Sequence, residues 1–188
     1  MSEVLDVIAK RSSIKAYTDE KLTKEEIEAL VTAGLQAPTA RNSQEIHISV
    51  LDGSNPLLGE IEAEKRAFFA AQAVNEEARG QILNATSNFY YNAPTVLILS
   101  AEAENGWREI DAGIAVENIA LAAQSLGLGN VILGVIKGVF TGERKAYFEN
   151  ALQFPEGYAF AIAIAVGHTA AGKEPHAINL SKDVSFLK

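Results

Sequence analysis

The segment Lys10–Tyr17, KRSSIKAY, carries three cations and two hydroxyls in a chain whose formal net charge is −8. Arg11 and Lys15 are four residues apart, and Ser12 and Ser13 lie where a first helix is predicted to end. An arginine offers a planar fork to phosphate oxygens, a lysine offers a point charge, and hydroxyls with loop amides complete an anion site. The same residues are also typical of a solvated helix end, where cations stabilise the C-terminal dipole. The segment alone therefore leaves an anion site and an ordinary helix terminus both open.

A second polar segment, residues 37–44 (APTARNSQ), lies between a predicted helix and a predicted strand. Its side chains could hydrogen-bond a sugar-alcohol chain or the polar edge of a ring, although the same composition is typical of an ordinary loop. Further along, Gly134 interrupts the strand-like run NVILGVIKG. A glycine at that place indicates either a bulge or the close approach of the backbone to a ligand.

The sequence argues against several other kinds of site. The chain has no cysteine and three histidines, so disulfides and thiolate chemistry are excluded and a transition-metal site is not expected. It has no Gly-x-Ser-x-Gly elbow, no Gly-x-x-x-x-Gly-Lys loop and no dinucleotide-binding glycine turn, which disfavours the enzymes that use them. The net charge of −8 argues against nucleic acid and anionic membrane as partners, because both reward a basic face.

Length and composition predict a single domain over residues 1–188. Apolar residues make up 48% of the chain and charged residues 21%, as in an ordinary globular protein. The first residues carry acids where a secretion signal would carry cations, and no apolar run approaches the roughly 18 residues of a membrane span. We therefore expect a cytoplasmic protein.

Hydrophobic spacing indicates the elements that must position these segments. A short amphipathic helix is predicted over residues 4–10. A second helix begins after the capping box of Thr23 and Glu26 and closes within residues 34–38. The alternation in EIHISVLDG predicts a strand over residues 45–53.

The middle of the chain begins with a third predicted helix. Asn55 and Pro56 are typical of a helix start, so this helix is expected to run toward Ala73. Residues 75–92 are polar and favour no element clearly. Residues 93–101 form a continuous β-rich run, which predicts a strand buried on both faces.

The second half of the chain predicts the centre of the fold. The helix expected over residues 111–126 is apolar on nearly every side, which is typical of an element at the centre of a structure or against a second subunit. Two more buried strands are predicted at 130–136 and 158–167, with a helix over 141–152 between them. This order of elements predicts an α/β or α+β sandwich around a sheet of at least four strands. The tail, residues 174–188, is expected to add an edge strand or to reach a partner.

Three features in this order resemble the FMN-dependent nitroreductase family: the Arg-Ser-Ser-x-Lys start, the Pro-Thr-Ala-x-Asn-x-Gln loop, and the Leu-Gly-Leu-Gly turn that leads to a glycine-containing strand. The resemblance spans Arg11 to His176. It implies an α+β fold, a three-layer α/β/α sandwich with a mixed central sheet of four to five strands. It also implies a homodimer in which the C-terminal tail extends to the partner subunit.

The resemblance further assigns residues to FMN. The first segment would hold the phosphate and the pyrimidine edge, the loop after the second helix would come from the other subunit, and the backbone of Gly134 and Val135 would lie by the flavin N5. The FYYNAP run is expected to place Tyr90 or Tyr91 near the ring. The cofactor-binding residues implied in this way are Arg11, Ser12, Ser13, Lys15, Pro38, Thr39, Ala40, Asn42, Leu133, Gly134, Val135, Lys173 and His176.

The sequence departs from the family pattern at three places. Ala40 stands where a serine is usual, which removes one possible hydrogen bond. Glu45 and Ile46 follow Gln44 where the family usually has Pro-Trp. His176 stands where an arginine is common, and a histidine near a phosphate would make FMN affinity partly dependent on pH.

The activity that the resemblance implies is a ping-pong oxidoreductase. NADH or NADPH would pass a hydride to FMN and leave, and a nitroaromatic, a quinone or a related flat electron acceptor would take its place. No acid–base side chain is expected to be catalytic, because the cofactor supplies the chemistry. Two alternatives stay open: a flavin-binding storage or regulatory protein of the same fold with little reductase activity, and a cofactor-free dimeric interaction module.

Overall fold

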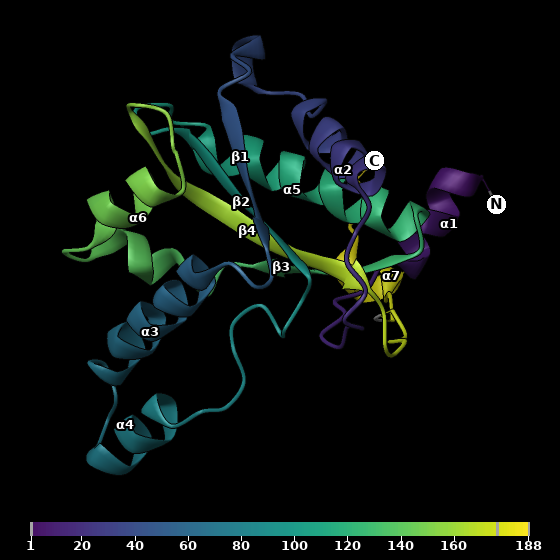
Figure 1. Cartoon of the computed structure of the whole chain (residues 1–188). Coiled ribbons are helices and arrows are strands. Elements are labelled where there is room, and N and C mark those ends of the chain that lie inside the picture. The colour runs from purple at the N-terminus through teal and green to yellow at the C-terminus, as the bar shows by residue number, and fades with distance from the viewer. Residues whose placement is uncertain (1, 176, 188) are drawn as a thin grey trace.

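The computed structural model describes residues 2–175 and 177–187 of the chain. Four strands and a set of helices alternate along it (Figure 1). In chain order the elements are α1 (Glu3–Lys10), α2 (Lys24–Leu35), η1 (Ala40–Asn42), β1 (Ile46–Asp52), α3 (Pro56–Ala70), α4 (Glu76–Leu83), β2 (Thr95–Glu102), α5 (Arg108–Ser125), β3 (Leu128–Leu133), η2 (Lys137–Thr141), α6 (Lys145–Ala151), β4 (Tyr158–His168) and α7 (Leu180–Asp183).

The four strands form one sheet in the order β1-β2-β4-β3. All three pairings between these strands are antiparallel. Because β4 lies between β2 and β3 and runs opposite to both, these two like-directed strands do not pair with each other. The sheet is thus four-stranded and antiparallel where a mixed sheet was predicted, and an isolated bridge between Ser13 and Asn130 adds one parallel pairing at its edge.

Alternate residues of the central strands face two separate cores. On β2, Val96 and Ile98 belong to a core with α3 and α6, whereas Leu97 and Leu99 belong to a core with α2 and α5. This alternation is the period of two of an extended strand whose faces are both buried. Figure 1 shows α2 and α5 on one side of the sheet and α3 and α6 on the other. The predicted three-layer α/β/α sandwich is confirmed.

The predicted helix starts are also confirmed. At α2 the Thr23 N–H donates to Glu26 Oε2 at 2.7 Å, and the Glu26 N–H donates to Thr23 Oγ1 at 3.2 Å. At α3 the Asn55 side chain accepts from the Leu57 N–H at 3.0 Å, and Pro56 occupies the first turn. These contacts satisfy backbone N–H groups that have no partner within the helix.

Two elements near glycines differ from the prediction. β3 ends at Leu133, so Gly134 follows the strand instead of interrupting it. Of the helix predicted over 141–152, the structure forms α6 over Lys145–Ala151; η2 ends at Thr141, and Gly142 between them has extended backbone with φ −89° and ψ −176°.

The tail also differs from one of its two predicted forms. Among the described residues it contains α7 and no strand, and the Phe186 side chain is 86% exposed. The predicted edge strand is therefore not formed within one chain, while contact with a partner stays a prediction. In the part of the chain that the structure describes, no helix is both long and apolar enough to cross a membrane.

Candidate functional site

The segment 11–17 is attached to the sheet at two points. The Ile14 N–H donates to the Asn130 carbonyl of β3 at 2.8 Å. Tyr17 forms a bridge with Thr169, which follows β4 directly, and its hydroxyl donates to the Ile14 carbonyl at 2.7 Å. Since these contacts pair backbone groups that would otherwise lack partners, the ends of β3 and β4 fix the shape of the segment.

A hydrogen bond joins this segment to the start of the tail. The Ser12 hydroxyl donates to the Lys173 carbonyl at 2.9 Å, across a sequence separation of 161 residues. Ser12 is only 8% exposed, and the bond is partly buried. It brings the backbone of Lys173 to the segment that carries Arg11 and Lys15, as the resemblance implies.

The two cations of residues 11–17, Arg11 and Lys15, each contact another side chain. Arg11 Nε lies 3.6 Å from Glu117 Oε1 on α5. Glu117 is half-exposed, and an ion pair that solvent reaches contributes little to stability. An anionic ligand could therefore take the place of Glu117 on Arg11 at small cost.

Lys15 lies against an aromatic ring. Its Nζ is 5.1 Å from the centre of the Tyr91 ring, a distance typical of a cation–π contact. Burial, and to a smaller extent Tyr91, raises the pKa of the neighbouring Tyr17 well above its usual range. Tyr17 therefore stays a neutral hydroxyl donor to the Ile14 carbonyl.

The loop 38–44 has a different construction. Three of its residues, Arg41, Asn42 and Gln44, adopt left-handed backbone with φ of 57°, 53° and 55°. The Ala40 N–H donates to Asp111 Oδ1 on α5 at 3.0 Å, and the Gln44 N–H donates to Thr39 Oγ1 at 2.9 Å. Such sparsely populated backbone persists only where neighbouring contacts hold it.

The two polar segments lie far from each other within one chain. Figure 1 shows η1, the middle of this loop, at the top beyond the start of β1, whereas the stretch after α1 lies near α7 at the lower right. Along α5, the loop is bound at Asp111 in the first turn, while Arg11 meets Glu117 further on. A single chain therefore does not bring them to one ligand.

The third predicted segment lies at the edge of the sheet. Gly134 and Val135 follow β3 directly and are both exposed. A Cβ on Gly134 would meet only Ile162 Cδ1, at an ordinary 3.9 Å, so there is open space beside this backbone. Asn130 and Gly134 are four residues apart, about 13 Å along the strand. The cations and the exposed glycine thus lie toward opposite ends of β3.

Comparison with known proteins identifies the family. The family model described as "Nitroreductase family" matches residues 8–168. The chain belongs to the nitroreductase family.

Relatives of this chain match nearly its whole length. A candidate NADH dehydrogenase/NAD(P)H nitroreductase of Archaeoglobus fulgidus is 30% identical over 89% of this chain and 86% of its own. An FMN reductase [NAD(P)H] of Bacillus subtilis is 26% identical over 90% of this chain and 67% of its own. A nitroreductase of Desulfitobacterium hafniense, solved with bound FMN, is similar in fold, with a TM-score of 0.88, 32% identity and 100% coverage of both chains.

The structure brings some of the predicted site residues together and leaves others apart. Together are Arg11, Ser12, Ser13, Lys15 and Lys173. Apart from them, in the loop before β1, are Pro38, Thr39, Ala40 and Asn42. Leu133 is buried as the last residue of β3, with Gly134 and Val135 exposed after it. His176 lies outside the described residues.

Sequence reasoning missed the residues that position the predicted site. Asn130 and Asp111 each bind the backbone of a predicted segment. Glu117 pairs with Arg11. All three belong to β3 or α5 and contact residues far away in the sequence, so no local pattern marked them. The aromatic run did point to Tyr90 or Tyr91, and it is Tyr91 that lies against Lys15.

Proposed function

We propose that this chain is an FMN-dependent NAD(P)H oxidoreductase that works as a homodimer. The observation that carries the proposal is the Ser12–Lys173 hydrogen bond, which joins the tail to the segment of Arg11 and Lys15. The backbone of Lys173, a third cationic residue, thereby lies beside the segment of Arg11 and Lys15 in an acidic chain. The FMN-bound relative from Desulfitobacterium hafniense and the Bacillus subtilis FMN reductase support FMN as the ligand.

The donor groups fit the two ends of FMN. Arg11 and Lys173 would bind the phosphate, with the hydroxyl of Ser13 beside them, because guanidinium and ammonium groups make charge-assisted hydrogen bonds to phosphate oxygens. Lys15 would meet the phosphate or the pyrimidine edge. The open backbone at Gly134 and Val135 would lie by the flat ring and give it an amide donor.

The bound cofactor supplies hydride transfer from NADH or NADPH to a nitroaromatic, a quinone or a related flat acceptor. The chain's part is to bind and orient FMN and to leave one face of the ring open to flat molecules. The net charge of −8 does not oppose phosphate binding, because salt screens distant charges beyond about 8 Å at physiological ionic strength.

A second copy of the chain would complete the site. The loop 38–44 does not reach the segment 11–17 of its own chain, and several of the exposed large apolar side chains lie on α1, at α5 and in the tail. These are Val4, Leu5 and Ile8 of α1, Trp107, Ile110 and Ile114 at α5, and Ile178, Leu180, Phe186 and Leu187 of the tail. Exposed apolar surface of this extent is typical of a subunit interface. We propose that the partner covers it and contributes Pro38, Thr39, Ala40 and Asn42 to the flavin.

The experiment is a titration of the purified chain with FMN, followed by absorbance, fluorescence and sedimentation. We expect a dimer that binds FMN and gains thermal stability from it by mass action. Addition of NADH or NADPH without air should then bleach the flavin absorbance, and an acceptor should restore it.

Each part of the proposal has its own contrary result. A chain that binds FMN but is not reduced by either nucleotide would be a storage or regulatory flavin-binding protein. A chain that gains no stability from FMN would not be a flavoprotein. A monomer that binds FMN tightly would contradict the shared site.

A further inference from the structure

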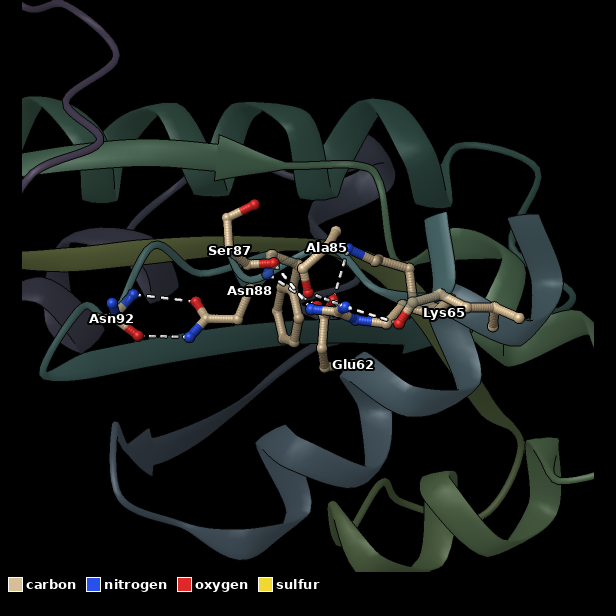
Figure 2. Close-up of polar contacts among 9 residues, drawn as sticks. Glu62, Lys65, Ala85, Ser87, Asn88 and Asn92 are labelled. Carbon is tan, nitrogen blue, oxygen red and sulfur yellow. Dashed lines mark hydrogen bonds and ion pairs between the residues drawn. The ribbon is translucent and has the colours of Figure 1, made fainter. Parts of the chain in front are cut away.

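A nearly buried ion-pair cluster on α3 anchors the loop that leads into β2. Glu62 is 8% exposed, and its Oε1 lies 2.6 Å from Arg66 Nε and 3.1 Å from Lys65 Nζ. Its other oxygen accepts from the Phe89 N–H at 2.8 Å. Figure 2 shows Glu62 below the stretch that carries Ala85, Ser87 and Asn88, with Lys65 to the right. A buried carboxylate with two cations and a backbone donor is well compensated, so the cluster is a rigid point of attachment.

The guanidinium of Arg66 extends this attachment along the loop. It donates to the carbonyls of Leu83, at 3.3 Å, of Ala85, and of Ser87, at 3.0 Å. An irregular segment has to find partners for its backbone groups outside regular secondary structure. One side chain here satisfies three of them, and the loop is thereby held to α3 from its first residue.

The end of the loop is held in an unusual backbone conformation. Tyr91 and Asn92 have φ of 53° and 55°, in the left-handed region that bulky side chains rarely adopt. Asn88 and Asn92 bridge this turn twice, because the Asn88 Nδ2 donates to Asn92 Oδ1 at 2.5 Å and the Asn92 N–H donates to Asn88 Oδ1 at 3.0 Å. Figure 2 shows this pair side by side.

This construction separates three consecutive aromatic side chains. Phe89 is buried in the core, and Tyr90 packs edge-on against it with ring centres 5.1 Å apart. Tyr91 instead meets the Lys15 Nζ at 5.1 Å. A connection from α4 to β2 does not by itself require a left-handed tyrosine. The left-handed backbone of Tyr91 is energetically unfavourable. This same conformation places its ring against the Lys15 ammonium.

We propose that the loop 85–92 is part of the flavin site, and that Tyr91 is a positioning residue which holds the Lys15 ammonium where it contacts FMN. Glu62 and Arg66 act one step further away, because they fix the loop that carries Tyr91. The inference rests on the FMN binding proposed above. It adds to the proposed site the loop that connects α4 to β2.

The test is a double-mutant cycle on FMN affinity, measured by flavin fluorescence. Tyr91→Leu removes the ring face, and the dissociation constant for FMN should rise about two- to fivefold, as expected for the loss of a cation–π contact. Tyr91→Phe keeps the ring and should bind FMN as the parent does. In a Lys15→Met chain, Tyr91→Leu should have no further effect, because no ammonium is left to position.

A matched control separates this role from general packing. Tyr147 on α6 makes a similar contact with the Arg144 guanidinium, 4.6 Å from its ring centre, and is also partly exposed. Tyr147→Leu should leave FMN affinity unchanged. A Tyr91→Leu effect of equal size with and without Lys15 would overturn the positioning role, and so would no effect at all in the parent chain.

A second variant tests the anchor without FMN. Glu62→Gln keeps the shape of the side chain and removes its charge, so amide hydrogen exchange in residues 85–92 should speed up while β2 stays protected. Unchanged exchange in the loop would show that the ion pair does not hold it. A parent chain that binds no FMN would refute the proposed function, whereas a parent that binds FMN and a Tyr91→Leu chain of equal affinity would refute this inference alone.

Discussion

The two polar segments that the family resemblance assigns to one flavin are built in opposite ways. The segment 11–17 carries the cations and lies against the sheet, where Asn130 and Thr169 pair with it. The loop 38–44 carries neutral polar groups and one cation, Arg41, partly on left-handed backbone, and it is bound to the layer of α5 through Asp111. The first segment is complete within its own chain, whereas the second offers its polar groups outward at the far end of the molecule.

This contrast indicates how the contacts to the flavin are divided between the segment 11–17 and the loop 38–44. A left-handed non-glycine residue costs on the order of 1–3 kcal/mol. A loop with three of them does not have the backbone of lowest energy, which is typical of a functional site. A preformed cationic half and a strained polar half that do not meet in one chain are what a site shared between two subunits requires.

The largest expected effect comes from removing the cation of the preformed half. Arg11→Ala should weaken FMN binding by about 10- to 150-fold, because the phosphate loses a charge-assisted partner. Fluorescence titration with FMN measures the change. Lys24→Ala, which removes an exposed cation of α2 that pairs with Glu28, should bind FMN as the parent does. Equal affinities for the parent and the Arg11→Ala chain would end the assignment of Arg11 to the phosphate.

The next effect is expected at the surface that joins the two halves. Ile114 on α5 is 38% exposed in one chain, and Ile114→Asp would bury a charge if a partner covers it. The dimer dissociation constant should rise about 30-fold or more, the size typical of an interface hot spot. Sedimentation at several concentrations measures it, and FMN binding should weaken in parallel.

The control for this variant lies on the other side of the sheet. Val74, between α3 and α4, is 92% exposed, and Val74→Asp should change neither dimerisation nor FMN affinity. If Ile114→Asp dimerises as strongly as the parent chain, α5 does not form the interface.

Much of the fold could be predicted because its signals are local. The capping box of Thr23 and Glu26 and the alternation in β1 involve residues a few positions apart, and both predictions are confirmed. An interruption at Gly134 was predicted, but the end of the strand there and the break at Gly142 were not, because a glycine permits several backbone conformations and the sequence does not say which one is used. The antiparallel order of β2, β4 and β3 depends on contacts across the whole chain.

The candidate site could be predicted in its residue types and less well in its geometry. The spacing of Arg11 and Lys15 indicated an anion site, and the resemblance added Lys173, whose backbone the structure brings to Ser12. The residues that position these groups, such as Asn130 and Glu62, act through contacts between distant segments. A single sequence contains no local pattern for such contacts.

The most direct test of the shared site mixes two deficient chains. Asn42→Gly keeps the left-handed backbone of the loop 38–44 and removes the Asn42 amide. It should weaken FMN binding about two- to tenfold, as expected for one lost hydrogen bond. The Arg11→Ala chain instead lacks the arginine of the cationic segment 11–17. Differently tagged copies of the two chains can be co-expressed and the mixed dimer isolated.

If the cations of one subunit and the loop of the other hold the same FMN, the mixed dimer contains one site with both defects and one intact site. Titration should then show one FMN bound per dimer with the affinity of the parent protein. If both segments of a single chain served the same flavin, every site of the mixed dimer would carry one defect. Failure to recover any site of parental affinity would contradict the shared flavin site.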